Sequence, residues 1–223
     1  MRCLYLHGFA SGPRSQKALF FAARLRNQGF AVHVPDLNEP DFADLTLTRQ
    51  LDHAQRIAEQ ISSDEPLLVL GSSMGGLVAT LLCERLSNVG GLILLAPGFG
   101  INKRWESMPG TDELSKWQQK GFHEVFHYQT QSDRPLKYAF VQDMNQYRTD
   151  GLHVSVPTLV FHGKRDEVIP VEESRKFFRD NSEFVEYHEL DSDHDLIDVL
   201  DDMWAQVDRF VARHTVVSLA NAR

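Results

Sequence analysis

The sequence predicts an α/β fold in which about six parallel strands form one small sheet with helices on both faces. Short apolar runs recur along the chain, and most end in Gly, Pro or Asp, as expected for strands buried on both faces. Segments with helical periodicity separate these runs, and such alternation is typical of βαβ units in a parallel sheet. The six runs are RCLYLHGF, FAVHVPDL, PLLVLGSS, GLILLAPG, PTLVFHGK and EFVEYHEL.

The helices are located by apolar residues that recur every three or four positions. The first helix is expected to end before Gly29, because glycine readily adopts the left-handed conformation beyond a helix C-terminus. Pro170, followed by two glutamates, predicts the first turn of another helix. A closing amphipathic helix is expected from Leu196 to Phe210. The first two apolar stripes are Ala18, Phe21, Ala22 and Leu25, and then Leu51, Ala54, Ile57, Ala58 and Ile61.

The region at approximately residues 101–156 departs from this alternation of strands and helices. The apolar pattern is looser there, and two glycines and a proline interrupt it, although Leu136 to Tyr147 is compatible with a helix. We expect an insertion that lies over the strand ends as a lid or cap. A chain of 223 residues is long enough for one well-packed core, so residues 1–223 are predicted to form a single domain.

Composition limits the kinds of partner and location. The formal net charge of −8 argues against a surface that neutralises phosphates, so nucleic acid is not an expected partner. No apolar stretch approaches the length of a membrane span, and the short run CLYL does not resemble a signal peptide, so a soluble, cytoplasmic protein is expected. Cys3 and Cys83 are expected to be buried free thiols.

The segment HEVFH, residues 123–127, matches the zinc-protease pattern H-E-x-x-H. That pattern binds zinc only on a helix, which places both histidines on one face. Gly121 interrupts any helix that precedes it, and the bulky residues around the motif favour a strand at least as well. A third ligand at the usual spacing is also missing, because the next glutamate is Glu167. We therefore predict no metal site and interpret the segment as part of the insertion.

The segment LGSSMGG places Ser73 in a G-x-S-x-G motif at the point where a strand turns into a helix. This is the context of a nucleophile elbow, in which a tight turn exposes the serine hydroxyl and requires residues without Cβ atoms at Gly71 and Gly75. The alternative is a phosphate-binding glycine-rich turn, but the spacings G-x-x-x-x-G-K-[ST] and G-x-G-x-x-G are both absent. Ser73 is the predicted nucleophile.

A serine nucleophile needs a base, which in turn needs an acid to orient it. In proteins with such an elbow, the acid and then the base follow the serine in the chain. Asp166 follows the fifth predicted strand, and we choose it as the acid over its neighbour Glu167. His194 follows the sixth and is the predicted base, whereas the other histidines weighed lie in predicted strands, a helix or the tail. The aspartates around His194 lack the spacing of a calcium loop and are interpreted as solvated carboxylates.

An oxyanion hole requires two backbone N–H groups directed at the carbonyl oxygen of the substrate. Met74, directly after the nucleophile, is expected to supply one. Phe9, in the loop LHGFASG after the first strand, is expected to supply the other, although simple packing of Phe9 is the alternative. His7 is expected to form hydrogen bonds within the same loop.

These motifs together resemble the α/β-hydrolase superfamily, and YLHGFASGPRSQKA resembles in particular the small YqiA-like bacterial esterases. The resemblance covers essentially the whole chain and implies a three-layer α/β-hydrolase fold. It implies hydrolysis of esters or thioesters, with catalytic roles for Ser73, Asp166 and His194. The chain begins directly at the strand before the oxyanion loop, so the usual first two antiparallel strands are expected to be absent.

The predicted function is therefore that of a serine hydrolase that cleaves a small-molecule carboxylic ester or thioester through an acyl-enzyme, without a cofactor. A peptidase or a C–C bond hydrolase would use the same triad, and a non-catalytic binding protein on this fold is the alternative from another class. Aromatic residues of the insertion are candidates for an apolar acyl pocket, with plain packing as the equal alternative. These residues are Phe99, Trp105, Phe122 and Phe126, with Met108 and Trp117 as further members.

Overall fold

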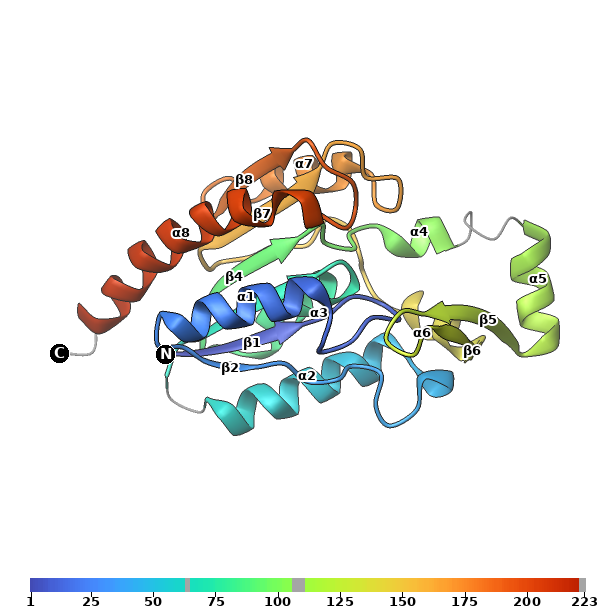
Figure 1. Ribbon diagram of the computed structural model, residues 1–223. Coiled ribbons are helices and arrows are strands. Elements are labelled where there is room, and N and C mark those ends of the chain that lie inside the picture. Colours follow the sequence, from blue (N-terminus) through green and yellow to red (C-terminus); the bar gives the residue numbers. More distant parts are fainter. Residues whose placement is uncertain (63–64, 106–110, 221–223) are drawn as a thin grey trace.

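A parallel six-stranded sheet forms the centre of the molecule (Figure 1). The computed structural model describes residues 1–62, 65–105 and 111–220. The strand order is β2-β1-β3-β4-β7-β8, and every neighbouring pair in it is parallel. The predicted sheet is thus confirmed. Its strands are β1 (Arg2–Leu6), β2 (Ala31–His33), β3 (Leu67–Ser72), β4 (Val89–Leu95), β7 (Thr158–Gly163) and β8 (Val185–Leu190).

Helices bury both faces of this sheet, because alternate residues of a strand point to opposite sides. On β3, Leu68 and Leu70 pack in one apolar cluster with residues of α1 and α8. Leu67 and Val69 belong to a second cluster with residues of α2, α3 and α7. Figure 1 shows α1 and α8 together in front of the sheet. The bounds are α1 (Gln16–Asn27), α2 (Leu47–Ile61), α3 (Met74–Arg85), α7 (Val171–Asp180) and α8 (Leu200–Ala220).

The helix boundaries follow the expected signals, with one exception. Gly29 lies just beyond α1 with φ +86°, and Pro170 directly precedes α7. The closing helix, however, does not begin at Leu196, which adopts a left-handed conformation with φ 53°. A short 3₁₀ helix, η2 (Ile197–Val199), follows it and leads into α8. Among the described residues, no helix combines the length and the apolar character needed to cross a membrane.

The segment between β4 and β7 forms a separate group of elements beyond the carboxyl ends of the strands (Figure 1). The predicted helix over 136–147 is only partly correct, because Leu136 lies in a strand and pairs with His123. The Leu136 carbonyl accepts a hydrogen bond from the indole N–H of Trp117 at 2.9 Å. The buried Leu136 is therefore held by a contact with a residue distant in the sequence. The elements are α4 (Ile101–Trp105), α5 (Thr111–Lys120), β5 (Phe122–His127), β6 (Ser132–Lys137) and α6 (Ala139–Met144).

The β5–β6 hairpin is attached to the rest of the protein at its turn. The ring of His127 packs edge-on against Phe42, with centroids 4.7 Å apart, in the short 3₁₀ helix η1 (Phe42–Asp44). The N–H of Tyr128 donates to the carbonyl of Ala10 at 2.9 Å. The hairpin therefore contacts the loop after β1 directly.

Replacement of Phe21 tests the packing of α1 on the sheet. Phe21 is fully buried, whereas Leu19 on the same helix is 55% exposed. Phe21→Ala should lower the free energy of unfolding by about 3–5 kcal/mol, because it leaves a cavity between α1 and the sheet. Leu19→Ala, the matched control, should change it by no more than about 0.5 kcal/mol. Urea unfolding of both variants measures the difference, and equal effects would contradict the described packing.

Candidate active site

Ser73 lies in a strained turn between β3 and α3. Its backbone has φ 52° and ψ −120°, a conformation that L-residues rarely adopt and that costs of the order of 1–3 kcal/mol. The flanking glycines allow the turn because other backbone passes close to them. A Cβ on Gly75 would lie 2.5 Å from the carbonyl oxygen of His7, and one on Gly71 would lie 2.7 Å from the Cα of Gly76. Both glycines of the motif are therefore required by sterics.

Backbone hydrogen bonds hold this turn in place. The N–H of Ser73 donates to the carbonyl of Leu95 at 2.9 Å, which ties the turn to β4. The carbonyl of Ser73 accepts from the N–H groups of Gly76 at 2.8 Å and Gly98 at 2.9 Å. These contacts offset the strain and fix the position of the Ser73 side chain.

The structure brings Ser73, His194 and Asp166 into one chain of hydrogen bonds. Nε2 of His194 lies 2.9 Å from Oγ of Ser73, and its Nδ1 lies 2.7 Å from Oδ2 of Asp166. The side chain of His194 is 16% exposed and that of Asp166 is fully buried. Because Nδ1 faces a carboxylate, it carries the ring proton, which leaves Nε2 to accept the hydroxyl proton of Ser73. This is the arrangement in which an imidazole can act as a general base on a serine.

Four donors surround the buried carboxylate of Asp166. Its Oδ1 accepts from the backbone N–H groups of Val168 at 2.9 Å and Ile169 at 2.8 Å. Its Oδ2 is contacted by His194 and also by Nε2 of His162 at 3.0 Å. Burial acts to raise the pKa of Asp166, but the hydrogen bonds from His162 and His194 hold this pKa well below its usual range. The neighbouring Glu167, the rival acid, is exposed.

The loop that carries His194 rests directly on the end of β7. A Cβ on Gly163 would lie 2.5 Å from the carbonyl oxygen of Ser192 and would also collide with the backbone of Asp193. The N–H of Arg165 donates to the Ser192 carbonyl at 3.0 Å. Within the loop, Oδ1 of Asp193 accepts from the N–H of Asp195 at 2.9 Å. The aspartates next to His194 thus shape its loop or lie exposed at the surface.

The loop after β1 lies beside Ser73. A Cβ on Gly8 would lie 3.3 Å from the Cβ of Ser73. Phe9 follows, and its ring packs between Phe42 and Phe140, with centroid distances of 5.7 and 5.3 Å. The side chain of Phe9 therefore packs between two other rings, which is the alternative considered for this residue. Met74 is the first residue of α3, so its N–H precedes the hydrogen bonds of that helix.

His7 fixes the conformation of the same loop. Its Nε2 accepts from the N–H of Leu37 at 2.9 Å, so the ring proton lies on Nδ1. Nδ1 then donates to the carbonyl of Gly8 at 2.8 Å. The expected role of His7 in hydrogen bonding within the loop agrees with this geometry.

The HEVFH segment lies in strand β5, one of the two alternatives, strand or helix, that its sequence allows. On a strand, residues four apart are separated by about 13 Å, too far for one zinc ion. His127 is buried against Phe42 and Glu124 is exposed on the opposite face. In the described ranges 1–62, 65–105 and 111–220, no three His, Cys, Asp or Glu side chains are grouped as metal ligands.

The aromatic residues proposed for an acyl pocket lie in different surroundings, as far as their side chains are described. Phe99 is buried against Phe177, with ring centroids 4.5 Å apart. Phe122 and Phe126 lie on the outer face of β5, where Lys120 covers the Phe122 ring at 4.2 Å and Phe126 is 45% exposed. Trp117 is buried in the core. Only the backbone of Trp105 is described, as the last residue of α4, and Met108 lies outside the described residues.

Two residues near the triad were not identified from the sequence. His162 was interpreted only as a strand residue, although its side chain contacts Asp166. Lys17, near the start of α1, interacts electrostatically with Asp166, Asp193 and Asp195, and burial lowers the pKa of its ammonium group. The only signal for His162 is its place four residues before Asp166. Nothing in the sequence indicates that α1 brings a cation to this end of the sheet.

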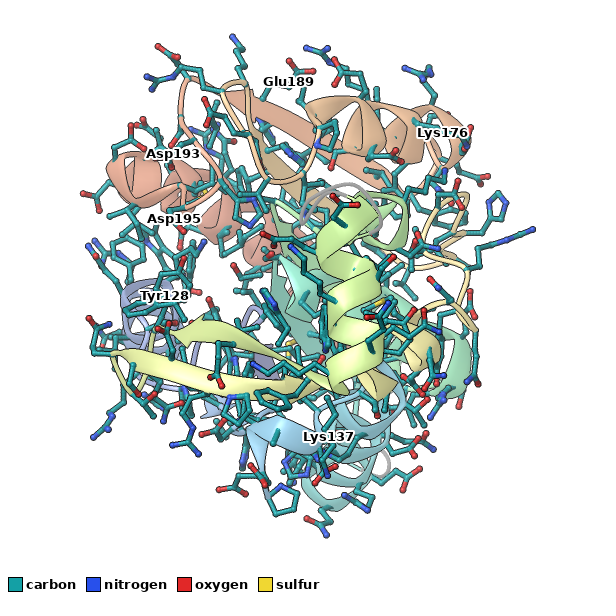
Figure 2. All side chains as sticks on the ribbon, turned by 90° about the vertical axis from the view of Figure 1, so that its right-hand side faces the viewer. Tyr128, Lys137, Lys176, Glu189, Asp193 and Asp195 are labelled. Carbon is teal, nitrogen blue, oxygen red and sulfur yellow. The ribbon has the colours of Figure 1, made fainter. Side chains whose placement is uncertain are left out.

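Figure 2 views the molecule from the side of the insertion. Asp193 and Asp195, which flank His194, lie on the same side of this view as Tyr128, which follows β5. Tyr128 is 65% exposed, and its ring meets that of Phe126 edge-on at 5.3 Å. An exposed aromatic pair therefore lies next to the loop that contains Phe9, to which Tyr128 is bonded through Ala10.

Comparisons with known proteins identify the family and the fold. A family model described as Uncharacterised protein family (UPF0227) matches residues 2–211. No curated protein sequence matches the chain. A candidate hydrolase from Agrobacterium vitis S4 superposes with a TM-score of 0.82 at 21% identity, over 94% of this chain and 87% of the other.

Two further solved structures share the fold. Mouse alpha/beta hydrolase domain-containing protein 10 has a TM-score of 0.77 at 17% identity, over 95% of this chain and 90% of the other. Est1E from Butyrivibrio proteoclasticus, with ferulic acid bound, has a TM-score of 0.74 at 19% identity, over 96% and 89%. These similarities establish the α/β-hydrolase fold.

Gly163→Ala tests the close approach of the His194 loop to β7. The new Cβ must displace backbone of Ser192 and Asp193, which should lower the free energy of unfolding by about 1–3 kcal/mol. Gly91 on β4 is the control, because a Cβ there meets its nearest neighbour at an ordinary 3.5 Å. Denaturant unfolding should separate the two variants. If Gly163→Ala is as well tolerated as Gly91→Ala, the loop does not rest on β7.

The lowered pKa of Asp166 predicts a specific acid dependence of stability. An unfolded aspartate titrates near about 3.9, so the stabilisation by the ionised carboxylate is complete above that pH and is lost as the pH falls toward the folded value. The difference in free energy of unfolding between the wild type and Asp166→Asn should therefore shrink steadily below about pH 4. Asp202→Asn, at an exposed position of α8, reports the general effect of removing one negative charge. A difference for Asp166→Asn that stays constant down to about pH 2 would contradict the assignment.

Proposed function

Because the chain belongs to the family described as Uncharacterised protein family (UPF0227), and because it has an α/β-hydrolase fold, we propose that it is a serine hydrolase that cleaves carboxylic esters or thioesters. The observation that carries the proposal is the unbroken contact from Ser73 through His194 to Asp166, at 2.9 and 2.7 Å. A strained serine between two obligatory glycines supports it further, because such strain is retained where a hydroxyl has to be exposed.

In the proposed reaction, Oγ of Ser73 attacks the carbonyl carbon of the substrate while its proton passes to Nε2 of His194. The tetrahedral intermediate collapses and expels the alcohol or thiol, which receives the proton from Nε2. A water molecule then attacks the acyl-enzyme by the same route, its proton passing to His194 and then to Ser73. Asp166 holds the ring in the correct tautomer and stabilises the imidazolium formed in each half of the cycle.

The oxyanion is proposed to bind to the N–H groups of Phe9 and Met74. The position of Gly8 beside Ser73 supports the first donor, and the position of Met74 at the start of α3 supports the second. The positive end of the helix dipole lies at the same point, which favours a developing negative charge. Each such donor contributes roughly 10²–10³ in kcat. The proposed chemistry uses no cofactor.

A small-molecule ester is the favoured substrate class, with a thioester as the next choice. Est1E, one of the proteins that share the fold, is described with ferulic acid bound, although identities near 20% carry the fold rather than the substrate. We further propose that residues 101–156 act as a cap of a single domain, because the β5–β6 hairpin contacts the loop that contains Phe9. A peptidase or a C–C hydrolase would need the same three residues. A non-catalytic binding protein is disfavoured because binding requires no Ser–His contact directed at a buried acid.

Labelling with a fluorophosphonate tests the nucleophile directly. The wild type should be labelled on Ser73, as located by mass spectrometry, and should hydrolyse p-nitrophenyl esters. Ser73→Ala should lose both properties with an unchanged melting temperature, because loss of the nucleophile costs about 10⁶ in kcat. Ser72→Ala, at the adjacent buried serine, is the matched control and should remain labelled. Residual hydrolysis above a few per cent in pure Ser73→Ala would reject the proposal.

The identity of the acid is tested by two neighbouring substitutions. Asp166→Asn should reduce kcat by about 10⁴, because the imidazole is then held in the wrong tautomer. Glu167→Gln should have little effect, since the Glu167 side chain is exposed. Hydrolysis of p-nitrophenyl butyrate measures both, and a larger loss in Glu167→Gln would mean that the acid is wrongly assigned.

A further inference from the structure

The carboxylate that orients His194 is shared with a second histidine. Oδ2 of Asp166 lies 2.7 Å from Nδ1 of His194 and 3.0 Å from Nε2 of His162. His162 is completely buried on β7, four residues before Asp166. We propose that His162 is a positioning residue for the hydrolytic reaction: its N–H holds Oδ2 in place for His194 and limits how strongly that oxygen attracts the proton on His194. This inference rests on the function proposed above.

The surroundings of His162 determine where its proton lies. Nε2 faces two acceptors, Oδ2 of Asp166 at 3.0 Å and the carbonyl oxygen of Ile169 at 3.0 Å. An unprotonated nitrogen cannot satisfy either, so Nε2 carries a proton. On the other side of the ring, Nδ1 lies 2.7 Å from Oγ of Ser174, which is also fully buried. In the neutral ring, Nδ1 accepts the hydroxyl proton of Ser174. Ser174 therefore fixes the orientation in which the Nε2 proton of His162 is shared between the carbonyl of Ile169 and Oδ2 of Asp166.

The contact from Nε2 of His162 affects both the position and the electron density of Oδ2 of Asp166. The backbone donors of Val168 and Ile169 bind only Oδ1, so they leave the carboxylate free to tilt about that anchor. His162 supplies the second fixed point. Because Oδ2 also accepts from His194, each donor reduces the negative charge available to the other. A stronger bond from His162 therefore makes the His194 ring a weaker base, and removal of His162 makes it a stronger one.

Other charged groups lie near Asp166 and His194, and any test of His162 has to leave these charges unchanged. They lie on the elements packed around Asp166 and His194: Lys17 on α1, and Asp193 and Asp195 in the loop after β8. Lys17 opposes a positive charge on His194, whereas the two aspartates favour it. The ring nitrogens of His162 contact Asp166, Ser174 and Ile169, so substitutions at 162 and 174 leave these three charges in place.

Three substitutions separate positioning from packing. His162→Leu removes the donor and keeps most of the volume, whereas His162→Gln keeps an amide N–H on a side chain of similar reach. Ser174→Ala releases Nδ1 without altering the ring. Thr158→Val is the matched control, because Thr158 is also fully buried on β7 and its hydroxyl donates to Val156 at 2.9 Å, away from Asp166.

The readouts are kcat, KM and the acid limb of kcat/KM against pH for p-nitrophenyl butyrate, with the rate of fluorophosphonate labelling of Ser73 as a second measure. His162→Leu should lose about 100-fold in kcat, the loss associated with a misplacement of about 1 Å, with little change in KM. Its acid limb, which reports the free enzyme's base, should move to higher pH by about half a unit. His162→Gln should restore most of kcat and return the limb toward the wild type. Ser174→Ala should shift the limb in the same direction by a smaller amount, and Thr158→Val should not shift it.

Several outcomes would overturn the inference. One is a folded His162→Leu variant with wild-type kcat and an unmoved limb, and another is a loss of activity without a limb shift that His162→Gln fails to restore. If His162→Leu does not fold, Ser174→Ala decides, because a wild-type profile in that variant rejects the proposed coupling. Labelling of Ser73 in the wild type keeps these outcomes distinct from failure of the proposed function. If the wild type is labelled elsewhere, or if Ser73→Ala retains activity, both proposals fail together.

Discussion

The buried charge of Asp166 is the constraint on which the arrangement of this site depends. An ionised carboxylate removed from water is stable only when hydrogen-bond donors replace the water. Here the donors come from three segments: the backbone after β7, the ring of His162 within β7, and the ring of His194 after β8. The charge of Asp166 therefore connects the ends of the neighbouring strands β7 and β8. It also holds His194 where its Nε2 lies within hydrogen-bond distance of Oγ of Ser73. Loss of any donor would leave part of this buried charge without a hydrogen-bond partner.

Close contact between backbone segments is the second requirement. Gly75 lies against the end of β1, Gly71 lies against the first turn of α3, and Gly163 lies against the loop of His194. At each point a Cβ would collide with main chain, which cannot rotate away as a side chain can. The three catalytic candidates are brought together because strands β3, β7 and β8 end at one edge of the sheet and these glycines let the loops beyond them approach.

The sequence was sufficient to predict the features that depend on local patterns. Buried parallel strands appear as apolar runs, and Ser73, Asp166 and His194 each follow such a run, so their common location at one sheet edge could be predicted. Features that depend on contacts between distant segments could not. Leu136 has helical neighbours in sequence, yet its pairing with His123 and its bond from Trp117 place it in a strand. Phe126 resembles a pocket residue by composition, but strand alternation turns it outward.

The bond between the Tyr128 N–H and the Ala10 carbonyl has a consequence for how this protein can diversify. Ala10 adopts φ 53° in the loop that also contains Phe9, so the hairpin of the insertion contacts a strained segment beside Ser73. A cap joined to its scaffold only through flexible ends could be exchanged among relatives to alter selectivity while turnover stayed the same. In the proposed enzyme, the bond from Tyr128 to Ala10 would link the two properties. With the proposed cap, changes at the tip of β5 would alter turnover together with substrate choice, and new selectivity would require compensating changes around Ala10.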